Sequence, residues 1–148
     1  MERQARDFWT QKQFAVVGVS GTKKKFGYAV YSEMKKRGLQ VYAVNRNGAR
    51  IGEDISYPDL KSLPVQVDGA IIIVPKNETE KIVRNCEELQ IKNVWIQQGA
   101  ESEDAIRFCT EHQIQVVHHR CALMYLQPTQ FPHSIHHWIH RLFVKEKN

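Results

Sequence analysis

The stretch FAVVGVSGTKKKFGYAV, residues 14–30, combines glycines, hydroxyl groups and lysines directly after an apolar run. A turn that leads from a strand into a helix presents free backbone N–H groups and the positive end of the helix dipole, which together bind an anion. The spacing is neither G-x-G-x-x-G nor a P-loop, so this motif alone does not identify a nucleotide, and a tight turn with solvated lysines is the alternative. As candidates to hold a phosphate we take Gly18, Val19, Ser20, Gly21, Thr22 and Lys25.

A second polar group, VNRN, follows the apolar run at residues 41–44. A site for NAD usually carries Asp or Glu at this point, where the acid binds a ribose hydroxyl. Here Asn45 can bind ribose or adenine, and Arg46 suits a phosphate on the ribose through charge-assisted bonds. The pattern leaves open NADP, with its 2′-phosphate, and coenzyme A, with its 3′-phosphate; a solvated loop arginine is the other interpretation.

Two further groups end apolar runs. Val74 and Pro75 offer a flat apolar edge on which an adenine can lie. The amide-rich group Gln97, Gln98 and Gly99 ends the next run, and amides bind ligands more often than they catalyse. We expect both groups on the same rim of the fold.

The last apolar run is followed by Arg120 and Cys121. A cation beside a cysteine can make its thiol reactive, whereas a cysteine in apolar surroundings is usually a small buried side chain. We favour the buried interpretation and, from its position on the rim, take Cys121 as a further candidate to contact the cofactor. No catalytic triad can be assembled around Cys121 from the sequence.

The residues that position these groups form five apolar runs, at residues 14–19, 41–44, 69–74, 93–97 and 115–119. They are continuously apolar, as is typical of strands covered on both faces. Their alternation with helical patterns predicts an α/β fold: a Rossmann-like, doubly wound, mostly parallel sheet of five to six strands with helices on both faces, plus a C-terminal helix. The run at 69–74 should lie beside that at 14–19, so that the loops after both open at the topological switch point, where ligands bind.

Helices are expected at residues 27–37, from Asn77 and at 101–112. Gly38 should end the first of them, and Asn77 should cap the second with the help of Glu80. The long segment between the second and third apolar runs predicts a short edge strand near Ile51 and a short helix from about Pro58, which gives the strand order 3-2-1-4-5-6.

Length and composition indicate one small domain. The chain has 148 residues, 42% of them hydrophobic, and a net charge of +5. No apolar run is long enough to span a membrane, and no basic stripe with interleaved aromatics indicates nucleic acid. The N-terminus lacks a signal-peptide core, and the three cysteines suggest no disulfide framework, so we expect a cytoplasmic protein with Cys86 and Cys109 in its core.

The histidine-rich segment at residues 126–148 has apolar residues at helical spacing. Its histidine pairs, His133 with His137 and His136 with His140, have the i, i+4 spacing that can chelate a metal, although a plain polar helix face is the favoured interpretation. The apolar face can pack on the domain or form a homodimer contact.

Taken in order, AVVGVS (15–20), VYAVN (41–45), GEDISYPDLKSLP (52–64), IIIVP (71–75), VWIQQG (94–99) and RCALM (120–124) resemble the small CoA-binding proteins. Their domain is similar to the CoA-binding domain of the succinyl-CoA synthetase α subunit. The resemblance implies a pyrophosphate at Gly18, Ser20 and the following loop, the ribose phosphate at Asn45 and Arg46, adenine at Val74 and Pro75, and pantetheine along residues 97–99.

The synthetase reacts through a histidine of a further domain, and this sequence shows no such domain. We therefore expect residues 1–125 to bind coenzyme A or an acyl-CoA as a small-molecule nucleotide ligand without catalysis, with residues 126–148 as a helical extension. An NADP-dependent oxidoreductase, and an interaction or metal-binding protein built on the histidine-rich helix, are the alternatives.

Overall fold

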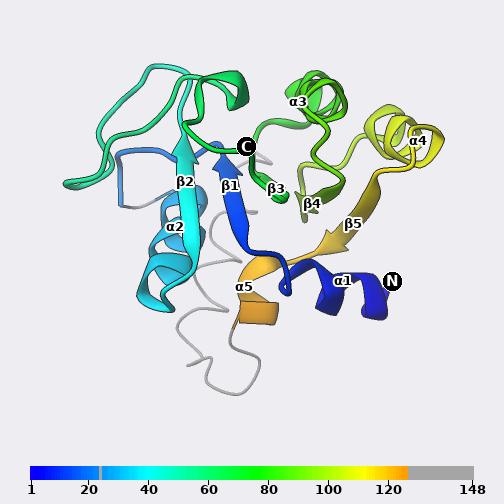
Figure 1. Ribbon diagram of the computed structural model, residues 1–148, viewed down its shortest axis with the longest axis horizontal. Coiled ribbons are helices and arrows are strands. Elements are labelled where there is room, and N and C mark those ends of the chain that lie inside the picture. Colours follow the sequence, from blue (N-terminus) through cyan, green and yellow to red (C-terminus); the bar gives the residue numbers. More distant parts are fainter. Residues whose placement is uncertain (24, 127–148) are drawn as a thin grey trace, which may run out of the picture.

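The structure is a computed structural model that describes residues 1–23 and 25–126. Five parallel strands form one sheet in the order β2-β1-β3-β4-β5 (Figure 1). The strands are β1 (Gln13–Val17), β2 (Gln40–Val44), β3 (Gly69–Ile72), β4 (Asn93–Gln97) and β5 (Gln115–Arg120). β3 pairs with β1, as predicted, so the chain reverses its direction of travel across the sheet between β2 and β3.

Helices cover both faces of the sheet, which confirms the predicted α/β architecture (Figure 1). One face carries α1 (Glu2–Phe8), α2 (Phe26–Lys36) and the short α5 (Ala122–Leu126). The other face carries α3 (Lys76–Glu88), α4 (Glu103–Glu111) and the 3₁₀ helix η1 (Leu60–Ser62). Among the described residues, no helix is long and apolar enough to cross a membrane.

The two faces take alternate side chains of the same strands, because successive residues of a strand point to opposite sides. On the α1 side, Trp95 is fully buried and contacts the rings of Phe8, Trp9 and Tyr125 at centroid distances of 5.1–5.5 Å. On the α3 side, Cys86 and Cys109 are buried, as predicted. Burial raises the pKa of Cys109 to about 12 and also raises that of Cys86, so both thiols are structural.

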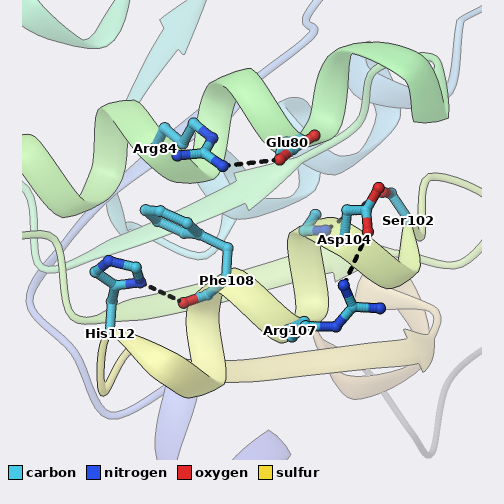
Figure 2. Close-up of polar contacts among 8 residues, drawn as sticks. Glu80, Arg84, Ser102, Asp104, Arg107, Phe108 and His112 are labelled. Carbon is cyan, nitrogen blue, oxygen red and sulfur yellow. Dashed lines mark hydrogen bonds and ion pairs between the residues drawn. The ribbon is translucent and has the colours of Figure 1, made fainter.

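α3 and α4 meet where a guanidinium group of α3 lies over an aromatic ring of α4 (Figure 2). The Arg84 guanidinium lies 4.6 Å from the centre of the Phe108 ring, and the His112 ring stacks on the same ring at 3.9 Å. Arg84 also pairs with Glu80 of its own helix at 3.0 Å. Ser102 caps α4 by accepting a hydrogen bond from the N–H of Ala105, which helps to fix where this helix begins.

Two local predictions are wrong. The edge strand near Ile51 does not form: Ile51 and Asp54 make only an isolated antiparallel bridge around a turn at Gly52, and Tyr57 makes a single parallel bridge to Val44. The sheet consequently ends at β2. Asn77 does not cap α3, because the helix already begins at Lys76, with Pro75 as the N-cap residue. Pro75 has a φ of −54°, which suits the start of a helix.

Candidate functional site

A cleft of about 440 Å³ opens at the switch point, between the loops that follow β1, β2 and β3. Its volume falls within the range of small-molecule pockets. α3 and η1 form the remaining walls. Seven of the residues that the sequence predicted for a binding site line this cleft: Gly18, Val19, Ser20, Asn45, Arg46, Val74 and Pro75.

Glycine at position 18 is required by the way the chain leaves β1. Gly18 has a φ of +106°, and a Cβ atom there would overlap the carbonyl oxygen of Ile73. A Cβ atom on Gly27 would overlap the carbonyl oxygen of Gly18, so α2 begins in direct contact with the same turn. The two glycines therefore let the backbone of the turn and the start of α2 approach the cleft closely.

The start of α2 has the properties of an anion site. Its N-cap residue, Lys25, makes no side-chain capping hydrogen bond within the described residues, and the first turn carries no acid. Ser20 Oγ accepts a hydrogen bond of 3.1 Å from the N–H of Thr22, which leaves the hydroxyl proton available to a ligand. Gly21, Thr22 and Lys25 are exposed beside the cleft and do not line it.

Asn45 fixes the shape of the cleft from inside the protein. Its side-chain amide donates to the carbonyl oxygen of Val19 at 2.7 Å, and its Oδ1 accepts from the N–H groups of Asn47 and Ala49. These bonds join the loop after β1 to the loop after β2. Much of the hydrogen-bonding capacity that the sequence suggested for a ligand is thus used to hold the two loops together.

Arg46 lies at the mouth of the cleft with 76% of its side chain exposed. Its guanidinium donates to the carboxylate of Glu78 at 3.1 Å, across the cleft from the first turn of α3. The sequence predicted the arginine but not this partner, which is 32 residues away along the chain.

The sequence interpretation also missed the wall formed by α3. Glu78, Lys81, Ile82 and Asn85 line the cleft from consecutive turns of this helix. Their i, i+3, i+4 and i+7 spacing is that of a single helix face, and this spacing was the signal available in the sequence. The apolar wall opposite comes from β1, β2 and η1, with Leu60 buried beneath the cleft.

The amide-rich group after β4 lies outside this cleft. Gln97 is only 2% exposed, and its Oε1 accepts a hydrogen bond of 2.9 Å from the N–H of Ala122, while its Nε2 is buried without a partner in the described part of the chain. Gln98 and Cys121 line a separate hollow of about 680 Å³ beside α1. Cys121 is 7% exposed, in agreement with the buried interpretation.

A cluster of titratable side chains joins the turn after β4, at Gly99, to the end of β5. The N–H of Gly99 donates to Glu101 Oε2 at 2.6 Å, and Glu101 Oε1 lies 3.4 Å from His119 Nε2. His119 has a φ of +57° beside a register shift in the pairing of β5 with β4, and its Nδ1 lies 2.6 Å from that of His118. Burial, together with the neighbouring His119, holds the pKa of His118 below its usual range.

The described residues, 1–23 and 25–126, contain no group of three or more His, Cys, Asp and Glu side chains arranged to hold a metal ion. The histidine pairs of the C-terminal segment and the suggested homodimer contact fall outside these residues.

Comparison with known proteins identifies the domain. The sequence profile of the CoA binding domain matches residues 12–127. The chain belongs to this CoA-binding domain family. It is similar to the α subunit of an ADP-forming acetate–CoA ligase II from Pyrococcus furiosus, with 36% identity over 90 residues, 60% of this chain and 20% of the relative. A corresponding ligase from Archaeoglobus fulgidus is 34% identical over 101 residues, 67% of this chain and 15% of the relative.

The chain thus spans a fifth or less of the length of these two relatives. The crystal structure of Prb, a protein redesigned for binding, superposes with a TM-score of 0.81 over 86% of this chain and 91% of that chain. The identity is 22%, so this likeness concerns the fold. The family match is to a CoA-binding domain. The cleft at the switch point is the candidate site for that ligand.

Proposed function

We propose that this chain binds coenzyme A or an acyl-CoA at the switch-point cleft, without catalysing a reaction of its own. The adenine would lie on Val74 and Pro75, and the ribose phosphate would meet Arg46. The pyrophosphate would lie at the turn after β1 and the start of α2, which has no side-chain cap among the described residues. The pantetheine arm would then run toward residues 97–99 and Cys121. Under this proposal residues 1–125 are the binding domain and residues 126–148 an extension.

The observation that carries the proposal is the guanidinium of Arg46 at the mouth of the cleft, in a chain of the CoA-binding domain family. The end of β2 is where NAD-binding domains present an acid to the ribose. An arginine there instead favours a ribose that carries a phosphate, because planar guanidinium groups bind phosphate oxygens through paired, charge-assisted hydrogen bonds.

The carboxylates of the cleft support binding rather than catalysis. Asp59 Oδ1 accepts hydrogen bonds from both the N–H and the hydroxyl of Ser62, at 2.8 Å each, and Glu78 is paired with Arg46. Both carboxylates therefore already have partners, and the described lining of the cleft contains no histidine that could act with either of them as an acid–base pair.

NADP is the second candidate ligand, because a 2′-phosphate on the same ribose would meet the same guanidinium. Its specific support is also Arg46, and the two ligands differ in the group attached beyond the pyrophosphate. An NADP-dependent oxidoreductase would require a nicotinamide subsite and a substrate beside it, and the family match favours coenzyme A.

Isothermal titration with CoA, dephospho-CoA and NADP tests the proposal. We expect CoA to bind more tightly than dephospho-CoA. Arg46→Gln should weaken CoA binding about tenfold, which is the lower end of the range for a charge-assisted hydrogen bond because Arg46 is largely exposed. Arg50→Gln is the matched control, since Arg50 lies in the same loop and does not line the cleft. Equal affinities for CoA and dephospho-CoA, or tighter binding of NADP, would contradict the proposal.

A further inference from the structure

The ion pair between Arg46 and Glu78 joins two walls of the cleft that are far apart in the sequence. Arg46 follows β2, and Glu78 stands in the first turn of α3, the helix that follows β3. The side chain of Glu78 is 35% exposed and that of Arg46 is 76% exposed, so the pair lies at the mouth of the cleft where a ligand would enter. An anion that reaches Arg46 therefore meets a guanidinium that already donates to a carboxylate through Nη1.

The carboxylate of Glu78 would act differently on two kinds of ribose. A ribose phosphate competes with it for the guanidinium and is repelled by its negative charge. A free ribose hydroxyl instead donates a hydrogen bond to a carboxylate, as it does to the acid at the end of the second strand in NAD sites. Glu78 thus disfavours a ribose phosphate, which Arg46 favours. It favours a free ribose hydroxyl, which Arg46 neither favours nor disfavours.

We propose that Glu78 is a specificity-determining residue that limits the preference of the cleft for a ribose-phosphorylated adenosine ligand over its unphosphorylated counterpart. This inference rests on the proposed function, in which Arg46 meets the phosphate. The other carboxylate of the cleft, Asp59, is occupied by Ser62, so Glu78 is the acid that faces the guanidinium. Lys81, three residues further along the same helix face, also lines the cleft, so that Arg46 and Lys81 balance the two carboxylates of the described lining.

The test is a comparison of Glu78→Gln with Glu80→Gln in the full chain. Glu80 is a matched control: it lies on the same helix, its carboxylate pairs with Arg84 at 3.0 Å, and it does not line the cleft (Figure 2). The side chains of the two glutamates are 35% and 40% exposed. Both substitutions remove one negative charge and one exposed ion pair from α3, so any difference between the variants comes from position.

Titration with CoA and dephospho-CoA at low ionic strength measures the effect as the ratio of the two dissociation constants. We expect Glu78→Gln to raise the preference for CoA about two- to fivefold, from released competition and removed repulsion at an exposed ion pair. Glu80→Gln should change the ratio less than about twofold. The difference between the variants should shrink at high salt, because exposed charges are screened.

The outcomes separate this inference from the proposed function. If the wild type prefers CoA through Arg46 and Glu78→Gln leaves the ratio unchanged, or lowers it, only the role of Glu78 is overturned. If the wild type shows no preference for CoA over dephospho-CoA, the proposed function fails and the role of Glu78 fails with it. Thermal unfolding of both variants checks that the changes in affinity do not come from a loss of folded protein.

Discussion

Substitution of Gly18 by alanine provides the strongest test of how the cleft is built. Gly18 has a φ of +106°, and an added Cβ atom would overlap the carbonyl oxygen of Ile73 in the neighbouring strand connection. Gly38, at the end of α2, also has a positive φ, of +75°, but nothing lies within 4 Å of an added Cβ atom there. The pair of positions separates the conformational cost of alanine from the cost of the overlap.

The conformational part should be at least as large in Gly18→Ala as in Gly38→Ala, because a φ of +106° lies further from the left-handed well of an L-residue than +75° does. An L-residue in the left-handed region costs about 1–2 kcal/mol, and this is the whole effect that we expect for Gly38→Ala. For Gly18→Ala the backbone must also move away from the Ile73 carbonyl, and overpacking of this kind adds about 1–3 kcal/mol. The free energy of unfolding should therefore fall by about 2–5 kcal/mol in Gly18→Ala.

Urea unfolding followed by circular dichroism measures both values under the same conditions, and thermal unfolding should show Gly18→Ala melting several degrees below Gly38→Ala, at roughly 2–4 °C for each kcal/mol. CoA affinity should fall in Gly18→Ala and remain at the wild-type value in Gly38→Ala, because only Gly18 lines the cleft. Equal stabilities of the two variants, to within about 0.5 kcal/mol, would show that the turn after β1 yields without cost and would refute this reasoning.

Two further predictions concern the far side of the rim. Gln97→Met should lower the free energy of unfolding by about 1 kcal/mol, the lower end for an unsatisfied buried group, because the N–H of Ala122 loses its acceptor while the unpartnered Nε2 is removed as well. Gln98→Met at an exposed position should change it little, and equal urea midpoints would contradict this. The pKa of His118 is lowered in the folded state by burial and by His119, so below about pH 6.5 the unfolded chain binds the proton more readily and stability falls. In urea unfolding, His118→Gln should lose less stability than the wild type between pH 8 and pH 5.5. An identical decline in both proteins would show that the pKa of His118 is not lowered in the folded state.

Much of the fold could be predicted because it depends on patterns local to the chain. The five buried strands are continuous apolar runs, and the end of α2 is marked by Gly38, whose φ of +75° only glycine adopts without strain. The edge strand near Ile51 failed for the opposite reason. The turn at Gly52 and the bond between Asp54 and the hydroxyl of Tyr31, at 2.7 Å, fix this segment through a helix 23 residues away, and no local pattern reports such a contact.

The sequence by itself determined the five strands and the family, and it predicted the chemical type of the candidate site. Glycines, hydroxyls and Arg46 follow buried strands, and parallel strands deliver such groups to one edge of the sheet. The tertiary structure alone decided what each side chain has left to offer. It joined Asn45 to Val19, buried Gln97 against α5 and set Glu78 opposite Arg46. These pairings depend on distances between elements that are far apart in the chain. The sequence shows only that each side chain is polar, and whether it joins two loops, is buried in the core or stays available to a ligand depends on those distances.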